Sequence, residues 1–272
     1  MNELVLPRKK PKLFHELNAI VTIMARDITL CFKSPGTIVM SIAMPMVMMG
    51  MLGGGLAQNM AGGLNFEYGP FMMVGMLIVM LFMITTMGIT TLVEDRLKDF
   101  TQEMMISPVS RYSIVIGKIF GSSFSALVGM MGTLIVGLVM GIALNPGQML
   151  MLLVLSPFMC LAAGALAMIV IGLIKSNRMA NIAIMLITMP QLFLSGAIIP
   201  INNSSGVLFV LSRIMPMTYC LDLARAVVYA GTPEYESIVL FNPVLNFAVI
   251  AMLTVAFLMV GTFLFVRSEK NR

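Results

Sequence analysis

The sequence predicts an all-α integral membrane protein: six transmembrane helices, an N-terminal amphipathic interfacial helix, and a re-entrant outer helical segment before the last span. Charged residues make up only 11% of the 272 residues, whereas a soluble domain carries about 25%. The longest uncharged run extends from Ile119 to Ile174. A spanning helix needs about 20 apolar residues. Because such runs are apolar on every side rather than alternating, they favour helices over a barrel.

Residues 1–36 are predicted to be a cytoplasmic N-terminus that includes the interfacial helix. No short apolar core with a small-residue cleavage site follows the basic start, so no cleaved signal is expected. From Leu13 to Phe32, apolar and polar residues occupy opposite stripes, which is typical of a helix lying in the membrane interface. The apolar stripe comprises Leu13, Leu17, Ile20, Val21, Met24, Ile28 and Cys31, and the polar stripe His15, Thr22, Arg26, Thr29 and Lys33. Residues 33–36 then break the helix.

Residues 37–266 form the predicted transmembrane domain, and residues 267–272 a cytoplasmic tail. The spans are expected near 37–57, 69–92, 113–143, 149–174, 179–200 and 244–266. A seventh candidate, 208–229, contains Arg213, Asp222 and Arg225. A charge inside the membrane costs roughly 2.5–3.5 kcal/mol on insertion scales. We therefore predict that 201–243 is an outer segment, re-entrant or surface-lying and broken at Pro216.

The distribution of basic residues supports six spans. With six, 15 of the 17 Lys and Arg residues lie on one side, before 37, in 92–118, at 175–178 and after 266. Positive charge marks the cytoplasmic side, so both termini are predicted to be cytoplasmic in a multi-pass protein of the plasma membrane. A seventh span would move the C-terminal bases outside.

Residues 94–106 form a predicted amphipathic helix between the second and third spans. Leu97, Phe100 and Met104 can share one face, with acids and bases around them, and Ser107-Pro108 ends the helix. A partner that grips such a helix can rotate both adjoining spans. The alternative is a solvated loop helix that only maintains the topology.

Residues 190–225 are too irregular for simple spanning. Gly196, Pro200 and Pro216 interrupt helices near the outer surface, and non-helical backbone at membrane depth is tolerated only against protein or a watery cavity. Asp222 and Arg225 are three residues apart and can pair on one helical face. The segment is either an outer lid with a surface ion pair or an outer gate.

The chain lacks the residues that several functions of membrane proteins require. One histidine and three cysteines give no metal or disulfide framework. Proton coupling and membrane-embedded hydrolysis need carboxylates or histidine at membrane depth, and the six predicted spans contain none. Gly117-Lys118 is followed by Ile119, so no phosphate-binding loop exists. A sodium-coupled transporter or a channel remains the alternative.

The two irregular segments resemble permease subunits of the type-2 ABC exporter family. The first motif is Ser107-Pro108-Val109-Ser110-Arg111 followed by Gly117-Lys118. The second is Leu194-Ser195-Gly196 with Pro200, then Pro216-Met217-Thr218-Tyr219 and Arg225. Together with the N-terminal helix and six-span layout, the resemblance covers nearly the whole chain. One departure is Asp99-Phe100-Thr101, where the family often has Gly-Thr.

The resemblance implies a permease that moves a hydrophobic drug, lipid or lipid-linked glycan outward. Expected partners are two cytosolic ATP-binding cassette ATPase subunits, a second permease half in a homo- or heterodimer, and membrane lipids. No nucleic-acid partner is expected, and no cofactor on this chain, because the ATPase binds the ATP. The implied ATPase-coupling residues are Glu94, Arg96, Phe100, Glu103 and Arg111. From the residues themselves, the candidates for the outer gate or re-entrant segment are Gly196, Pro200, Pro216, Tyr219, Asp222 and Arg225.

Two compositional features are open to more than one interpretation. Glycines four residues apart, such as Gly117 and Gly121, allow helices to approach closely, although a chain with 23 glycines contains such pairs by chance. The 31 methionines either replace leucine or line an adaptable path for apolar substrates.

Overall fold

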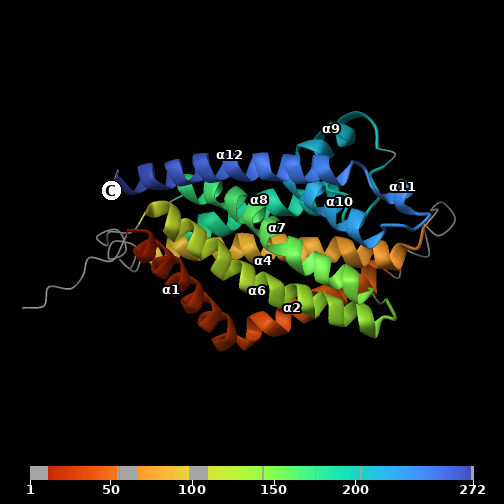
Figure 1. Cartoon of the computed structure of the whole chain (residues 1–272), viewed down its shortest axis with the longest axis horizontal. Helices are drawn as coiled ribbons and strands as arrows, with labels where there is room; N and C mark the ends of the chain where they lie inside the picture. The colour runs from red at the N-terminus through yellow and green to blue at the C-terminus, as the bar shows by residue number, and fades with distance from the viewer. Residues whose placement is uncertain are drawn as a thin grey trace, which may run out of the picture.

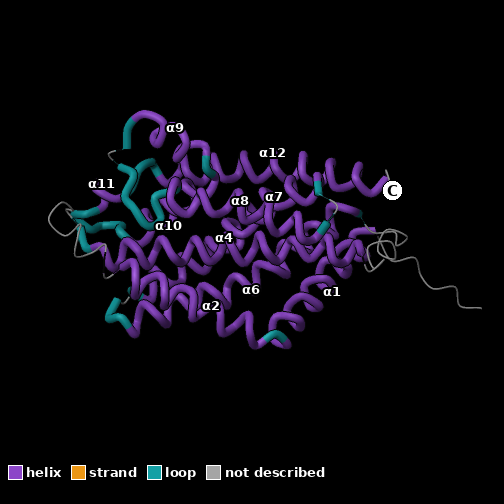
Figure 2. Tube along the Cα trace, turned by 180° about the vertical axis from the view of Figure 1, so that it is seen from behind, coloured by secondary structure: helices purple, strands orange, loops and turns teal. Residues whose placement is uncertain are grey.

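The computed structural model describes residues 12–53, 55, 66–97, 110–142, 144–174, 176–202 and 204–270. Within these ranges every regular element is helical (Figure 1, Figure 2), which confirms the all-α prediction. The elements are α1 (Lys12–Lys33), α2 (Pro35–Met48), a π-helix η1 (Met49–Gly53), α4 (Tyr68–Leu97), α6 (Arg111–Val139), α7 (Pro146–Leu173), α8 (Asn177–Leu194), α9 (Gly206–Ile214), α10 (Pro216–Val228), α11 (Tyr235–Ile238) and α12 (Pro243–Lys270).

Helix α4 is the axis of the bundle. Every residue from 71 to 82 is buried, because α6, α7, α8 and α10 all pack against it. A helix that is apolar on all sides and buried on all sides needs no polar face, which agrees with the uncharged sequence of this segment. In contrast, α12 packs mainly on α7 at the edge of the bundle (Figure 1) and leaves many apolar side chains exposed.

The first and last described residues lie at the same end of the bundle (Figure 1). We call the end that holds Lys12 and Lys270 the inner end. The opposite, outer end holds α10, α11 and the first residues of α4 and α12. This arrangement agrees with the predicted even number of crossings; which compartment each end faces stays a prediction.

Within the described residues, four helices, α4, α6, α7 and α12, are long and apolar enough to cross a membrane. Two bent pairs would raise the number to six if each counts as one span: α1 with α2, bent by 69°, and α9 with α10, bent by 83°. The predicted span at 179–200 corresponds to α8, which ends at Leu194. Its 18 residues rise about 27 Å, slightly less than the bilayer core of roughly 30 Å.

Local sequence signals fix where the helices begin. Proline is the first residue of α2, α7, α10 and α12, a position where its missing N–H costs nothing and its fixed φ favours the helix. Ser110 caps α6, since its hydroxyl accepts a hydrogen bond from the Tyr112 amide at 3.3 Å. At α7, the Gln148 side chain accepts from the Asn145 amide at 2.8 Å, the reciprocal part of a capping box.

Candidate functional site

Helix α1 packs on α6 at the inner end, and its contact face differs from the predicted apolar stripe. Ile23, Asp27 and Cys31 are buried at a spacing of four, whereas Leu17 and Val21 are exposed. The helix therefore presents one face to α6 and leaves predicted apolar positions open, which suits a helix that also touches lipid at the interface.

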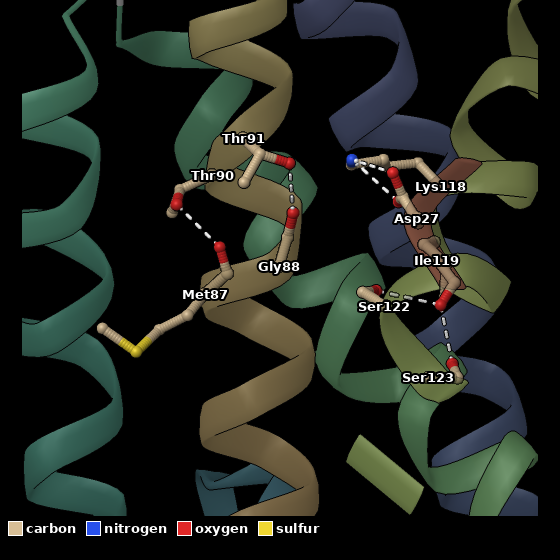
Figure 3. Close-up of polar contacts among 9 residues, drawn as sticks. All are labelled: Asp27, Met87, Gly88, Thr90, Thr91, Lys118, Ile119, Ser122 and Ser123. Carbon is tan, nitrogen blue, oxygen red and sulfur yellow. Dashed lines mark hydrogen bonds and ion pairs between the residues drawn. The ribbon is translucent and has the colours of Figure 1, made fainter. Parts of the chain in front are cut away.

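Asp27 and Lys118 form a buried ion pair between α1 and α6. The Lys118 Nζ lies 2.9 Å from Asp27 Oδ1 and 2.8 Å from Oδ2 (Figure 3). The lysine side chain is 4% exposed and the aspartate side chain 8%. Because removing one partner would leave the other charge buried and unpaired, such a pair holds its two helices in one register.

Two glycines allow α1 to approach α6 this closely. A Cβ added at Gly117 would lie 3.1 Å from the Ile20 Cα, and one at Gly121 would lie 2.8 Å from the Asp27 Cβ. Of the two interpretations of this glycine spacing, close approach holds at Gly117 and Gly121, with α1 as the neighbouring helix.

A third contact joins the beginning of α6 to α1. Both carboxylate oxygens of Glu16 lie 2.9 Å from the Ser110 amide nitrogen, which donates to them. A carboxylate at a helix N-terminus is favoured by the unpaired amides and the helix dipole. Contacts at Glu16, Ile20 and Asp27 thus fasten α1 to α6 along three turns.

Helix α6 in turn meets α4 one turn beyond Lys118. A Cβ added at Gly88 would lie 2.5 Å from the Ser122 Cβ. The hydroxyls at this crossing form hydrogen bonds within their own helices. Ser122 and Ser123 donate to the Ile119 carbonyl, at 2.9 and 2.6 Å. In α4, Thr90 and Thr91 donate to the Met87 and Gly88 carbonyls (Figure 3). We call the contacts of α1, α6 and α4 at Asp27, Lys118 and Gly88 the inner junction.

The inner junction adjoins the predicted ATPase-coupling segment at 94–106. Glu94 and Arg96 lie in the last turn of α4, and Arg111 is the first residue of α6. Phe100 and Glu103 lie outside the described residues, as does most of the segment. The coupling role of all five residues stays a prediction.

At the outer end, Asp222 in α10 holds the start of α12. Its carboxylate accepts hydrogen bonds from the Leu240 and Phe241 amides, at 2.7 and 2.9 Å, and from the Asn246 side chain at 2.8 Å. Asp222 is 1% exposed. Three donors satisfy the buried charge, so the residue connects α10 to the segment that enters α12.

Arg225, one turn along α10, contacts a different part of the chain. Its Nη2 donates to the Gly196 carbonyl at 2.8 Å, and its guanidinium lies 3.6 Å from the centre of the Phe71 ring, a cation–π geometry. The suggested pairing of Asp222 with Arg225 on one face is wrong: within the described residues no ion pair joins them, because each charge is directed to its own backbone partner.

The turn after α8 is held by groups from other helices. Gly196 has φ +84°, in the left-handed region that favours glycine. Its carbonyl bonds Arg225, and the Ile198 carbonyl accepts from the Tyr68 hydroxyl at 2.7 Å. A Cβ added at Gly75 would lie 2.1 Å from the Ala197 oxygen, so α4 supports the turn directly. Two carbonyls of this non-helical turn are thus satisfied by side chains of other helices.

The remaining predicted outer-gate residues shape the break between α9 and α10. Pro216 is the first residue of α10, and the Tyr219 hydroxyl donates to the Arg213 carbonyl at 2.7 Å. Gln191 of α8, which the sequence analysis did not single out, accepts from the Met217 amide at 3.4 Å. Pro200, just after the turn, is half-buried. Whether these residues open and close a path stays a prediction.

Two apolar grooves lie on the surface of the bundle. One, of about 470 Å³, lies between α2 and α4, and five of its lining residues are Met40, Met44, Met80, Met83 and Met87. The other, of about 440 Å³, is formed by one face of α8, at Ile182, Met185, Leu186, Met189, Pro190 and Phe193. Methionine adapts to irregular apolar shapes.

The long apolar helices, and the contacts that hold them at the inner and outer ends of the bundle, define a multi-pass, all-helical integral membrane protein. The sequence profile of the ABC-2 type transporter family matches residues 18–229, which is most of the chain. The chain belongs to this family. Over 73 residues it is 37% identical to Nodulation protein J of Rhizobium meliloti (strain 1021); this stretch is 27% of the chain and 28% of that relative.

Sequence reasoning missed Asp27 although the pattern contained a signal. Asp27 lies three residues after Met24 and four before Cys31, so an acid occupies the apolar side of an amphipathic helix. Such a position predicts a buried cationic partner. Lys118, inside a predicted span, was the available base, but only the packing of α1 on α6 brings the two together.

Proposed function

We propose that this chain is the transmembrane permease of an ATP-binding cassette exporter, driven by separate ATPase subunits. The observation that carries the proposal is the family match over residues 18–229. It is supported by the inner junction, where an amphipathic helix is fastened to α6, which follows the predicted coupling segment and packs in turn on α4, which precedes it.

In the proposed complex, two cytosolic ATPases bind the inner end of a permease dimer. Their ATP-driven closure pushes the segment at 94–106, tilts α4 and α6, and opens a path at the permease–permease interface. This orientation makes both termini cytoplasmic, with the outer end at the exterior face of the plasma membrane. Glu94, Arg96 and Arg111 are candidates for the coupling surface because they lie at the helix ends nearest that segment.

The proposed substrate is hydrophobic or amphipathic, such as a drug, lipid or lipid-linked glycan, and it enters laterally from the inner leaflet. The methionine-lined groove between α2 and α4 supports this class, since its lining is mostly apolar. Outward direction is part of the proposal and follows the family resemblance of the sequence motifs.

Affinity purification of the tagged full-length chain from mild detergent tests the energy source. We expect an ATP-binding cassette subunit to co-purify, and extrusion of a fluorescent amphiphile from cells to stop when ATP is depleted while the ion gradient is kept. If no such subunit is recovered and extrusion follows the ion gradient instead, the chain is an ion-coupled transporter and the proposal fails.

A second experiment tests the coupling surface. Glu94→Ala and Glu103→Ala are each expected to keep ATP hydrolysis by the complex while reducing transport, with unchanged membrane abundance. Transport at the unmodified level in both variants would remove these residues from the coupling role.

A further inference from the structure

Helix α1 continues directly into α2 along the chain, yet it is fastened to α6. The chain bends by 69° between α1 and α2, and the close contacts of α1 at Ile20 and Asp27 are with Gly117, Lys118 and Gly121 of α6. A displacement of α1 is therefore passed directly to α6, whereas it reaches α2 through the bend or through α6, on which α2 also packs.

The ion pair is the contact that most restricts sliding between α1 and α6. The glycines let the helices touch, but smooth surfaces alone allow one helix to move along another. The Asp27 carboxylate binds Lys118 through both oxygens, at 2.9 and 2.8 Å. Any axial shift of α1 separates these charges in a nearly dry environment, which is strongly unfavourable.

The same contacts extend to α4. Lys118 lies one helical turn before Ser122, against which Gly88 of α4 packs. Both helices that flank the predicted coupling segment are thus connected to α1 through a few tightly packed residues.

We propose that the Asp27–Lys118 ion pair is the positioning contact that holds α1 on α6, so that the two helices move as one rigid body during transport. The inference rests on the proposed function. Neither residue touches substrate or nucleotide in this scheme; they act by holding the register between the two helices.

Spin-label distances in the purified permease–ATPase complex test the rigid body. Labels are placed at exposed positions, Val21 in α1, Tyr112 in α6 and Val47 in α2, and measured without nucleotide and with a non-hydrolysable ATP analogue. We expect the α1–α6 distance to stay constant within its distribution. The α1–α2 distance shows whether the bend between those two helices also changes. A nucleotide-dependent change between α1 and α6 would overturn the proposal.

The paired variant Asp27→Asn with Lys118→Gln removes both charges of the ion pair at once. We expect the α1–α6 distance to become nucleotide-dependent, with ATP hydrolysis retained and transport of the fluorescent amphiphile per ATP lowered roughly tenfold, a coupling loss of typical allosteric size. The charge swap Asp27→Lys with Lys118→Asp should restore coupling. Lys33→Gln, at an exposed position on the same helix, is the matched control and should behave like the unmodified protein.

A disulfide between Ile20→Cys and Gly117→Cys gives a test that does not depend on the stability of charge variants. The two positions are in direct contact. If α1 and α6 move together, the oxidised protein transports as well as its reduced form, and the disulfide rescues the neutral pair. Loss of transport on oxidation would contradict the proposal. Failure of the proposed function would give a different result. In that case no ATPase subunit co-purifies, yet the variant Asp27→Asn with Lys118→Gln still broadens the distribution of α1–α6 distances.

Discussion

The two ends of the molecule use buried charge in opposite ways. At the inner junction an acid and a base from two helices meet each other. At the outer end Asp222 and Arg225 share one helix, but each binds backbone groups of a different loop. The inner pair joins two helices, whereas the outer charges fix non-helical segments to one helix.

The two arrangements suit different tasks: the inner pair can transmit movement between helices, and the outer charges hold non-helical segments in place. A helix-to-helix ion pair transfers a displacement, because both partners belong to rigid elements. A charge that satisfies loop amides or carbonyls restrains segments that would otherwise expose unpaired polar groups in a membrane protein. Damage at the inner end should therefore impair coupling, and damage at the outer end should loosen a local structure.

The largest effect is expected from breaking the inner pair on one side only. Lys118→Met leaves the Asp27 carboxylate buried without its cation, which should cost roughly 3–5 kcal/mol of unfolding free energy. Thermal unfolding of the detergent-solubilised protein measures the loss. Lys33→Met, at an exposed position, should stay within about 0.5 kcal/mol; equal effects of both changes would mean that the pair is not buried.

Removing the outer carboxylate should have a smaller and more local effect. Asp222→Ala leaves the Leu240 and Phe241 amides without their acceptor, at a cost of roughly 1–3 kcal/mol. Hydrogen exchange should accelerate at these two amides while amides in the middle of α6 keep their rates. Glu236→Ala, exposed on nearby α11, is the control. Acceleration spread evenly over the bundle would contradict a local role for Asp222.

The steric part of the inner junction can be tested with two glycines. Gly121→Ala pushes a methyl against Asp27 and should destabilise by about 1–2 kcal/mol, at the lower part of the overpacking range because the aspartate can shift slightly. Gly36→Ala, in the first turn of α2, meets no atom within 4 Å and should stabilise by up to about 1 kcal/mol. Melting temperatures that move in the same direction would argue against tight packing of α1 on α6.

The smallest effect should come from a single hydroxyl at the outer end. Tyr219→Phe removes the hydrogen bond to the Arg213 carbonyl, worth about 0.5–1.5 kcal/mol, and keeps the stacking on Phe241, whose ring centroid lies 5.6 Å away. Denaturation monitored by circular dichroism should detect this small loss. A loss as large as that of Lys118→Met would show that the break between α9 and α10 contributes more to stability than this one hydrogen bond accounts for.

Much of the helix layout was predictable because it depends on local chemistry. Uncharged runs identified the long helices, and proline at positions such as Pro146 and Pro243 marked where they begin. The ends were less predictable. Helix α8 stops at Leu194 rather than near 200 because Tyr68 and Arg225, both distant in sequence, satisfy the carbonyls of the turn that follows.

The candidate sites were predicted unevenly. Gly196, Asp222 and Arg225 were selected from the sequence and do meet structural partners, yet the partners differ from the expected pair. Asp27 was missed because its significance depends on a residue 91 positions away. A periodic pattern reveals which face of a helix is unusual but not which helix it will meet.

The sequence by itself determined that this chain is helical, membrane-embedded and built around long uncharged segments, since the cost of placing charge and unpaired backbone in lipid leaves few other solutions. Only the tertiary structure decided that α1 lies on α6 and that Asp222 and Arg225 serve separate loops. Those choices depend on contacts between residues far apart in the chain, where shape and charge must match at the same point in space.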